Sequence, residues 1–541
     1  MHRRLTASLL LFAGIFLPLA SLHAEPDSQA RSPVTVLLIN DVYRLDNLAG
    51  MRTLRRTLEA EHGKVLVLHA GDFLFPSLLS RRFKGEQMID LMNRLDGDAE
   101  AHDPLMFVTF GNHEFDKDRL KHHRLVSDRI QSSQFDWVSA NVEFRHDDHG
   151  APLVQGHNLH PYRLIDVNGT RVGLFGITID TKHPAYVERF GNYVETSRAM
   201  TAKLRGLGAE LVIALTHLTM DNDKELLGRL GDDGPDIIFG GHEHHRQTAE
   251  IKGRLAIKAD ADAVSAAVAR ITPRADKPPL VEHRFQIIPG EVEPDPVVAE
   301  RTILWEARYQ HEYCKEKGLG ELCLDKVIGR TQVELVAEEL TIRRFATNLG
   351  NWAMDLALET FRSQGAQVAF INSGSLRLNR NIAAGSEITR RTLDELFAYP
   401  NELVLIRITG ARLKQIVARS VEEWSGNGHW LQISGFDFRH HPGRGLVDRL
   451  RLHTPDGPRQ LADDEQILAV TNRYLIDSQG DQDGYLMLTP DMLVDPGTPR
   501  TRLRDLVIAA LQAAEPDGIA PLADGRICNG EFIEETCQRP E

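Results

Sequence analysis

Short runs of apolar residues alternate with amphipathic segments through the first half of the chain. Runs in which polar residues do not alternate with apolar ones are typical of strands buried on both faces. The segments between them place apolar residues at helical spacing, as in 47–63 and 84–95. The predicted strands lie at 34–40, 64–70, 105–110, 171–177, 211–217 and 236–241. The pattern therefore predicts an α/β domain, which we place at 33–290.

The alternation stops at an acidic, proline-containing segment, 289–296. Residues 297–320 then have the pattern of a single helix that ends in glycines. A second series of helix-like and strand-like segments begins near Leu324 and includes 341–361, 367–378 and 401–421. We therefore expect a linker with a connecting helix at 291–323 and a second α/β domain at 324–541.

The N-terminus has the three-part pattern of a secretory signal. Two arginines precede an apolar run from Leu5 to about Leu22, and a polar stretch follows Ala24. We expect cleavage after Ala24, so that residues 1–24 form the signal peptide, with an uncleaved membrane anchor as the alternative. No later segment has about 18 uninterrupted apolar residues, so we expect a periplasmic or secreted protein without stable membrane insertion.

Export also makes disulfide bonds possible. The chain has 4 cysteines, and each neighbouring pair encloses a short loop. We favour the pairs Cys314–Cys323 and Cys528–Cys537 among the three pairings that four cysteines allow. The sequence contains no C-x-x-C motif, so neither a structural zinc site nor a thioredoxin-like site is expected.

Length and charge restrict the number of domains and the kind of partner. A chain of 541 residues is too long for one compact core, which agrees with two domains. The formal net charge of −14 argues against a nucleic-acid partner, because nucleic-acid-binding proteins usually present a basic face. A small anionic substrate is compatible with this charge, since a bound metal can supply local positive charge.

Side chains that can bind metals follow five of the predicted strands. They are Asp41, Asp72, Asn112 with His113, His217, and His242 with His244. Open α/β sheets bind ligands at the carboxyl ends of their strands, so we expect these side chains to lie close together. Carboxylate, amide oxygen and imidazole suit divalent metals, and one carboxylate can bridge two ions about 3.5–4 Å apart. The set predicts a metal site suited to phosphate chemistry.

The order of these motifs resembles that of the calcineurin-like metallophosphoesterases, with "GNHEFD" at 111–116 and "GHEHH" at 241–245 as the most specific signatures. The second half is similar to the C-terminal domain of the secreted bacterial 5′-nucleotidase and UDP-sugar hydrolase family. The matching segments are 343–355, 371–377, 399–410, 429–435 and 483–485. The resemblance implies an α/β protein in which a four-layer α/β/β/α metallophosphoesterase domain is joined by a helix to a smaller α/β substrate-binding domain.

The resemblance also implies two divalent metal ions, which could be Mn, Zn, Mg or Co. The implied ligands are Asp41, Asp72 and His244 for one ion, and Asp72, Asn112, His217 and His242 for the other. The family usually has a histidine at position 43, whereas this chain has Tyr43. A neutral phenol with a pKa of about 10 is a poor ligand for these ions, whereas a phenolate would favour iron. We expect a working site with a weaker or altered first metal, and the role of Tyr43 stays open.

His113 is not implied as a ligand. By the resemblance it faces the phosphate and protonates the leaving oxygen, and Asp116 orients it. This division is chemically sensible because an imidazole titrates near neutral pH and a carboxylate can fix its tautomer. The alternative for Asp116 is the N-cap of a helix.

The second domain is expected to recognise the substrate. The resemblance assigns Arg343 and Arg377 to the phosphate or carboxylate end of the substrate, and Asn372 to a polar contact. Arginine suits phosphate because its planar fork is always charged. Trp430 and Tyr485 match the positions of two aromatic residues that sandwich a nucleobase in the family, with core packing as the alternative for each.

The expected function is that of a 5′-nucleotidase-like hydrolase that uses metal-activated water to release phosphate from nucleotides. A 2′,3′-cyclic-nucleotide phosphodiesterase with 3′-nucleotidase activity and a UDP-sugar or dinucleotide pyrophosphatase are alternatives with the same chemistry. A non-catalytic nucleotide-binding protein that keeps the fold is the alternative from another class. We expect a small-molecule nucleotide as the partner, no nucleic acid, and a monomer or weak dimer.

Overall fold

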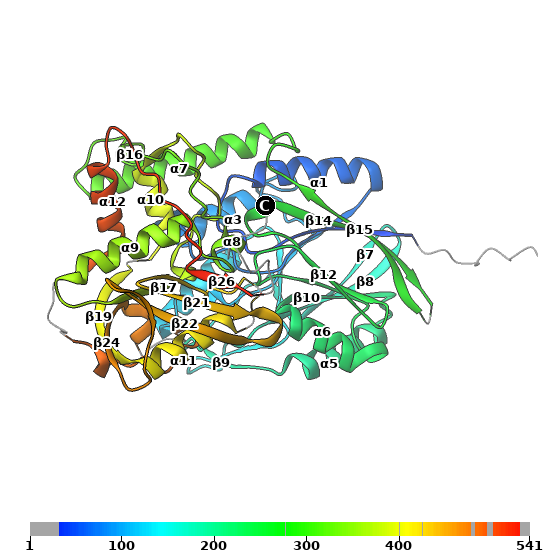
Figure 1. The fold of residues 1–541 in the computed structure, drawn as a ribbon. Coiled ribbons are helices and arrows are strands. Elements are labelled where there is room, and N and C mark those ends of the chain that lie inside the picture. The colour runs from blue at the N-terminus through cyan, green and yellow to red at the C-terminus, as the bar shows by residue number, and fades with distance from the viewer. Residues whose placement is uncertain are drawn as a thin grey trace, which may run out of the picture.

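The computed structural model of the protein shows two α/β domains that lie against each other (Figure 1). The residues that it describes are 32–530, apart from 276, 400, 423, 425, 478–481 and 495–500. The expected signal peptide, residues 1–24, and Cys537 lie outside the described residues. In the part that is described, no helix is long and apolar enough to cross a membrane.

Two sheets pack face to face in the N-terminal domain. The first contains, in spatial order, β15 (Lys277–Ile287), β14 (Ser265–Arg274), β1 (Val34–Ile39), β2 (Val65–His69), β3 (Met106–Val108), β4 (Asp136–Val138) and β6 (Leu159–His160). The second contains β12 (Gln247–Ile251), β13 (Arg254–Lys258), β11 (Ile237–Gly240), β10 (Leu211–His217), β8 (Thr170–Thr178) and β7 (Tyr162–Val167). Fully buried side chains of both sheets, such as Val36 and Leu68 from the first and Ile213 and Phe239 from the second, form the core between them.

Helices cover the outer faces of both sheets. The first sheet is covered by α1 (Leu48–His62), α3 (Glu86–Met92) and α4 (His123–Ser132), and the second by α5 (Tyr193–Gly206) and α6 (Met220–Leu230). Helix α1 buries Met51, Leu54 and Leu58, whose spacing of three or four residues gives one apolar face. A further helix and a strand pair complete the domain: α2 (Leu78–Phe83), β5 (Val142–Phe144) and β9 (Val187–Phe190). The expected four-layer α/β/β/α domain is confirmed.

The strands that precede the candidate ligands run parallel within each sheet. In the first sheet β1 pairs with β2, and β2 pairs with β3. In the second sheet β10 pairs with β11. Parallel strands present their carboxyl ends at one edge, so the loops that follow these five strands gather on one side of the domain.

The connecting helix α7 (Pro296–Glu316) packs on the N-terminal domain rather than crossing solvent. Its N-cap is Asp295, whose carboxylate accepts bonds from two backbone N–H groups of the first turn. Trp305 packs on Phe83 of α2, with ring centroids 5.0 Å apart, and its indole N–H donates to Asp90 Oδ2 at 2.6 Å. These contacts fix the helix relative to the first sheet.

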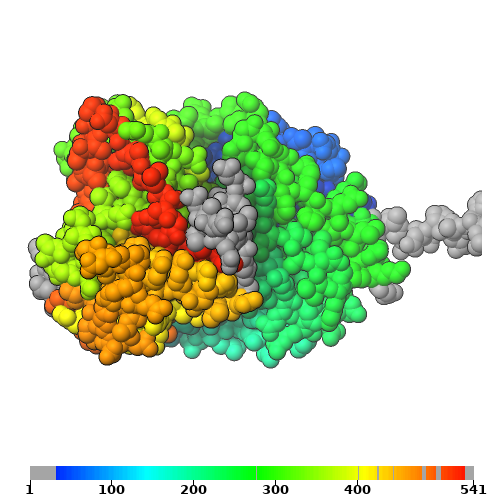
Figure 2. Space-filling view, viewed as in Figure 1, coloured from blue at the N-terminus to red at the C-terminus, as the bar shows by residue number. Residues whose placement is uncertain are grey.

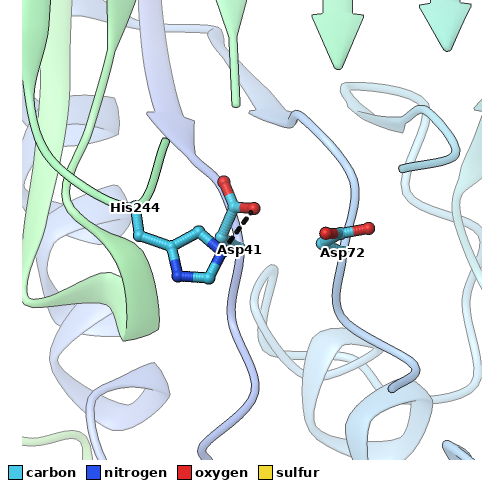
Figure 3. A group of neighbouring side chains, drawn as sticks. All are labelled: Asp41, Asp72 and His244. Carbon is cyan, nitrogen blue, oxygen red and sulfur yellow. Dashed lines mark ion pairs between the residues drawn. The ribbon is translucent and has the colours of Figure 1, made fainter. Parts of the chain in front are cut away.

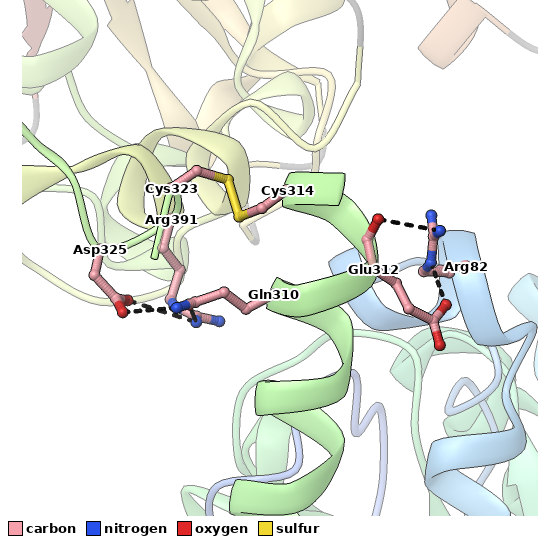
Figure 4. Close-up of a disulfide and its surroundings, with 7 residues drawn as sticks. All are labelled: Arg82, Gln310, Glu312, Cys314, Cys323, Asp325 and Arg391. Atoms are coloured by element: carbon pink, nitrogen blue, oxygen red, sulfur yellow. Dashed lines mark hydrogen bonds and ion pairs between the residues drawn. A yellow bond between two sulfur atoms is a disulfide. The ribbon is translucent and has the colours of Figure 1, made fainter. Parts of the chain in front are cut away.

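The C-terminal end of α7 is tied to both domains (Figure 4). On one side Arg82 of α2 forms an ion pair with Glu312 at 2.6 Å, and on the other Gln310 bonds to Arg391 at 2.6 Å. A disulfide joins Cys314 to Cys323, which confirms the first of the two expected pairs. The second expected pair falls on Cys537, outside the described residues. Helix α7 therefore links the domains as a fixed element.

The C-terminal domain is built around a five-stranded sheet. In spatial order its strands are β20 (Leu431–Ser434), β17 (Val368–Asn372), β24 (Gln466–Asn472), β19 (Glu402–Thr409) and β25 (Thr501–Arg502). One face is covered by α9 (Asn348–Arg362) and α12 (Leu503–Ala513), and the other by α11 (Gly410–Val421) with β21 (Phe436–His441) and β22 (Leu446–Thr454). The smaller elements are β16 (Val327–Arg330), α8 (Glu339–Ile342), β18 (Glu387–Thr389), α10 (Arg390–Leu396), β23 (Gly457–Gln460) and β26 (Ile527–Asn529).

The two domains meet over the strand ends of the N-terminal domain. Glu339 Oε1 of α8 lies 2.8 Å from His244 Nδ1, and Asn379 Nδ2 lies 3.4 Å from Asp262 Oδ2. In the space-filling view the yellow-to-red C-terminal domain lies directly against the green part of the N-terminal domain (Figure 2). The edge that gathers the candidate ligands is thus at the boundary between the domains.

Candidate functional site

Asp41, Asp72 and His244 form a compact group at the carboxyl ends of β1, β2 and β11 (Figure 3). Each offers a ligand atom, and these atoms lie within 4.8 Å of one another. His244 Nε2 is 3.4 Å from Asp41 Oδ1. Both carboxylates are at most 1% exposed, and Asp41 Oδ1 has no hydrogen-bond partner among the described residues. Two buried carboxylates beside a histidine suit a divalent cation, which would offset their charge.

The second group of expected ligands lies on the other side of Asp72. His217 Nε2 is 3.3 Å from Asp72 Oδ2 and 3.1 Å from Asn112 Oδ1. His242 Nδ1 is 3.2 Å from Asn112 Oδ1 and 3.3 Å from His217 Nε2. His217 Nδ1 donates to the carbonyl oxygen of Ala70 at 2.7 Å, which leaves Nε2 toward the group. The structure therefore brings together all six expected ligands, with Asp72 between the two groups.

The backbone holds these ligands in an unusual conformation. The φ angles of Asp41, Asp72, His242 and His244 are 54°, 62°, 96° and 60°, in the left-handed region that residues with a Cβ rarely adopt. The turns are also tight, because a Cβ at Gly111 would lie 2.1 Å from Asp72 Oδ1. The left-handed conformation turns each chain sharply at the strand end, so that the ligand side chains converge.

Buried side chains support this conformation. Glu114 accepts backbone N–H bonds of 2.8 Å from Asp72, 2.8 Å from Phe73, 3.0 Å from Leu74 and 2.6 Å from Gly111. Burial and the charge of Asp72 raise the pKa of Glu114 to about 7 in the metal-free protein. Glu114 therefore fixes the two loops that carry Asp72 and Asn112.

Tyr43 lies inside the first ligand group. Its hydroxyl donates to Asp72 Oδ2 at 3.1 Å and lies 3.1 Å from His244 Nε2. Burial raises its pKa well above the ordinary value, and the charges of Asp72 and Asp41 raise it further. In the metal-free protein the side chain is thus a neutral phenol that donates a hydrogen bond. The Tyr43 hydroxyl is therefore turned into the site, toward Asp72 and His244.

The histidines of the site have divergent proton affinities. Burial lowers the pKa of His217, but Asp72 outweighs burial and the pKa rises to about 9. Burial likewise opposes the charges of Glu339 and Asp41 on His244, whose pKa rises to about 10. For His242, burial and the neighbouring His217 lower the pKa to about 3. A metal ion must therefore displace protons from His217 and His244 but finds His242 neutral.

His113 and Asp116 form a pair beside the ligands. His113 Nδ1 lies 3.0 Å from both carboxylate oxygens of Asp116, and the backbone N–H of His113 donates to Asp72 Oδ1 at 2.7 Å. The ring of His113 is 6.0 Å from the ring of Tyr43. Lys182 Nζ lies 3.4 Å from Asp116 Oδ1. The carboxylate thus fixes the imidazole, and Asp116 lies at the C-terminal end of the short helix 113–115 rather than at an N-cap.

The structure places two of the expected substrate residues near the ligands. Arg343 is paired with Glu339, and both are nearly buried. Arg377 Nε donates to the carbonyl oxygen of Gly374 at 2.9 Å, and its guanidinium lies 5.6 Å from the centre of the Tyr399 ring. The charges of both arginines lower the pKa of Glu339, although burial opposes this effect. The two guanidinium groups therefore bring positive charge to the domain boundary.

Asn372 lies at the carboxyl end of β17 and is used within the C-terminal domain. Its amide nitrogen donates to Asp483 Oδ2 at 2.7 Å. Its carbonyl oxygen accepts from Ser375 Oγ at 2.6 Å and from Asn472 Nδ2 at 2.9 Å. This network holds the loop that leads to Arg377.

Trp430 and Tyr485 do not form an open base pocket in this structure. They are 1% and 0% exposed and belong to the core of the C-terminal domain. The indole N–H of Trp430 donates to the carbonyl oxygen of Phe345 at 3.2 Å, and the Tyr485 hydroxyl donates to that of His429. In this conformation the two rings are packed in the core with their polar atoms bonded to the backbone, and their contact with a nucleobase stays a prediction.

Some residues that support the site carry no clear signal in the sequence. Glu114 lies inside the motif at 111–116, but the motif does not indicate that its carboxylate accepts backbone N–H bonds from two loops. Asn40 precedes Asp41, and its amide donates to Asp41 Oδ2 at 2.8 Å. Lys258 Nζ lies 2.6 Å from Glu243 Oε2, between His242 and His244 in sequence, and Glu339 is 95 positions away from His244. Single residues of these types carry no recognisable signal.

Two protein-family models match the chain. The calcineurin-like phosphoesterase model matches residues 34–246, and the model of the 5′-nucleotidase C-terminal domain matches residues 327–489. These matches cover all six candidate ligands and the segment from Arg343 to Tyr485.

Individual relatives agree with the family models. The chain is 25% identical over 507 residues to the trifunctional nucleotide phosphoesterase protein YfkN of Bacillus subtilis, which covers 86% of this chain and 33% of that protein. It is 24% identical over 522 residues to the 5′-nucleotidase of Rattus norvegicus, covering 89% and 84% of the two chains. The chain thus spans about a third of the first relative and most of the second.

A solved structure supports the fold. The 5′-nucleotidase precursor from Thermus thermophilus superposes with a TM-score of 0.74 at 23% identity, covering 92% of this chain and 99% of that one. With the two family models, these findings show that the chain is a phosphoric ester hydrolase of the calcineurin-like phosphoesterase family with a 5′-nucleotidase C-terminal domain.

Proposed function

We propose that the protein is an exported hydrolase that uses two divalent metal ions to release phosphate from nucleotides, as a 5′-nucleotidase does. The observation that carries the proposal is the position of Asp72 between two groups of metal-binding side chains, with the pair of His113 and Asp116 beside them. The names of the relatives support nucleotides as the substrate class. The N-terminal apolar run supports export to the periplasm or medium.

Each metal would have its own side of Asp72. Asp41, Asp72 and His244 suit one divalent ion, and Asp72, Asn112, His217 and His242 suit the other. When bound, the two ions would polarise the phosphoryl oxygens and supply an activated water as the nucleophile.

The chain itself supplies the proton for the leaving group. His113 Nδ1 is held by Asp116, so the proton that the imidazole can give away is on Nε2. A proton from this nitrogen lets the leaving oxygen depart as an alcohol rather than as an alkoxide. The pair therefore serves as the general acid.

Substrate recognition belongs to the C-terminal domain. Arg343 and Arg377 bring two permanent positive charges to the boundary between the domains, where a phosphate or carboxylate group of the substrate would bind. Asn372 would act through the network that holds the loop of Arg377. The domain limits that we propose are 33–290, 291–323 and 324–541.

Tyr43 contacts the first ligand group through its hydroxyl, which donates to Asp72 Oδ2 at 3.1 Å. We propose that it keeps this role and does not bind metal as a phenolate. The first ion would then have three protein ligands and open positions for water and substrate, which is enough for a catalytic site.

A cyclic-nucleotide phosphodiesterase is the second candidate. The Bacillus subtilis relative is named a trifunctional nucleotide phosphoesterase, which supports more than one nucleotide substrate for this fold. A UDP-sugar or dinucleotide pyrophosphatase and a non-catalytic nucleotide-binding protein are the remaining alternatives. The Tyr43 side chain lies in the first ligand group, so it does not indicate which of these substrates is hydrolysed.

The proposal is tested by measuring phosphate release from AMP, UDP-glucose and 2′,3′-cyclic AMP. The mature chain is assayed with Mn²⁺, Mg²⁺, Co²⁺ or Zn²⁺, and the bound metal is counted by elemental analysis. We expect release of phosphate from AMP and loss of activity in Asp72→Ala, since Asp72 would contact both ions. Asp221→Ala is the control, because this carboxylate lies exposed on α6. A wild-type chain that binds no metal and releases no phosphate from any substrate would refute the proposal.

A further inference from the structure

The two nitrogens of the His244 ring have different partners. Nε2 faces the ligand group and lies 3.4 Å from Asp41 Oδ1 and 3.1 Å from the Tyr43 hydroxyl. Nδ1 faces away from the group and lies 2.8 Å from Glu339 Oε1. A carboxylate can only accept a hydrogen bond, so the proton of this contact is on Nδ1 and the ring donates. The lone pair of a neutral ring is then on Nε2, where a metal ion would bind.

Glu339 comes from the other domain. It is the first residue of the short helix α8, which follows β16 in the C-terminal domain, and 95 positions separate it from His244. The neighbouring Glu338 caps the same helix by accepting from the backbone N–H groups of Leu340 and Thr341, both at 2.9 Å. The cap turns the chain at α8 and leaves Glu339 directed at the N-terminal domain.

The carboxylate of Glu339 is held in place from its own side. Arg343, four residues later, pairs with the same oxygen that faces His244. The side chains of Glu339, Arg343 and His244 are 8%, 9% and 7% exposed. A buried carboxylate between a guanidinium and an imidazole has little freedom to turn away, so Glu339 is held in the orientation that contacts His244 Nδ1.

We propose that Glu339 is the positioning residue of His244, so that the C-terminal domain completes the site of the first metal ion when the two domains are in contact. Metal-binding histidines generally donate their second ring N–H to a carboxylate or carbonyl, which fixes the ring and makes it a better ligand. Here that carboxylate belongs to the substrate-binding domain. The inference rests on the proposed function only in that a metal ion binds the group of Asp41, Asp72 and His244.

This arrangement couples domain contact to metal binding. Separation of the domains removes the acceptor from His244 Nδ1 and frees the ring to turn. Coupling between two equilibria is reciprocal, so an ion bound at Nε2 favours the domain contact as much as the contact favours the ion. Metal loading would therefore bias the enzyme toward the arrangement in which Arg343 and Arg377 face the ligands.

The test is a double-mutant cycle on Mn²⁺ affinity, with Zn²⁺ measured in the same way. The full mature chain, Glu339→Gln, His244→Ala and the double variant are titrated against a chelating indicator. Loss of such a partner typically weakens metal binding by about 10–100-fold, and we expect Glu339→Gln to show this loss for one of the two ions. In the His244→Ala background Glu339→Gln should cause no further loss, because Glu339 acts through His244.

Glu359→Gln is the matched control. It makes the same change at an exposed glutamate of α9 that pairs with Arg362, so it should leave both affinities within about twofold. Glu339→Asp keeps the charge but shortens the side chain and should give an intermediate affinity, which keeps the test available if Glu339→Gln folds poorly. The inference would be overturned, and the proposed function left standing, if both Glu339 variants bound metal as tightly as the wild type. The same follows if Glu339→Gln weakened metal binding equally in the wild-type and the His244→Ala backgrounds. A wild-type chain that binds neither metal would overturn the proposed function as well.

Discussion

Lys258 is a buried lysine at the end of β13, and its removal tests how the ligand-bearing loop is held. Its ammonium lies 2.6 Å from the carbonyl oxygen of Leu218, 2.6 Å from Glu243 Oε2 and 3.0 Å from Asp223 Oδ2. Lys258 is 1% exposed and Asp223 is fully buried. Glu243 lies between His242 and His244 in the loop after β11, so the lysine anchors both candidate ligands.

The change Lys258→Met keeps most of the apolar stem and removes the charge. Breaking a buried ion pair from one side costs about 3–5 kcal/mol, because the remaining carboxylate is left without compensation. We expect a loss of this size in the free energy of unfolding of the metal-free protein. We also expect weaker metal binding, since Glu243 loses the lysine and keeps the bond from the backbone N–H of Met220.

The loss should depend on pH. Burial raises the pKa of Asp223 to about 6, even though Lys258 lowers it. Without the lysine the pKa rises further, so Asp223 in the variant is protonated at pH 5 and charged only at higher pH. A carboxyl group whose pKa is raised on folding contributes stability at low pH and loses it as the pH rises through the folded pKa. The variant should therefore be less destabilised at pH 5 than at pH 8.

Urea unfolding at pH 5 and pH 8, followed by tryptophan fluorescence, measures both effects. Lys252→Met is the control, because this lysine lies on the exposed turn before β13. Lys258→Met combined with Asp223→Leu should recover much of the loss, since an apolar pair often replaces a buried ion pair at little cost. A loss below about 1 kcal/mol at pH 8, or an equal loss at both pH values, would contradict the assigned network.

Two further predictions concern the metal-free site. Tyr43→Phe removes a hydrogen bond to a carboxylate, so it should lower the free energy of unfolding by about 1.5–3 kcal/mol and leave the number of bound ions unchanged; elemental analysis that shows one ion fewer would identify the phenol as a ligand. Because the pKa values of His217 and His244 are raised to about 9 and about 10, metal binding at pH 7 must release protons, and the affinity should rise between pH 7 and 9. Calorimetry in buffers of different ionisation enthalpy measures this release, and its absence would show that both rings are already neutral.

Much of the first domain follows from its sequence. The apolar runs predict the strands, and the parallel order of a buried sheet predicts that their carboxyl ends converge. Asp41, Asp72 and His217 could therefore be assigned to one site before any geometry was known. The periodicity of α1 and α7 likewise predicts both helices, although it does not show that α7 packs on the first domain.

The contacts between distant segments could not be predicted in the same way. Lys258 ends an apolar strand, and its sequence position predicts a surface residue. In the structure it is buried, because the loop of Glu243 lies over it. Glu339 reads as part of a helix terminus, and only the contact between the domains directs it at His244. The sequence similarity of Trp430 to its family counterparts does not determine whether the ring is open or buried, because that depends on the surrounding packing.

The left-handed backbone of Asp41, Asp72, His242 and His244 has a consequence for engineering this enzyme. Each residue with a Cβ in that region costs about 1–2 kcal/mol relative to glycine. A library selected for heat resistance alone should therefore enrich glycine or asparagine at these four positions, and the most thermostable clones should be the least active. Such a selection would identify the site residues as the positions where stability rises and activity falls. A useful thermostable variant must therefore come from substitutions elsewhere in the chain.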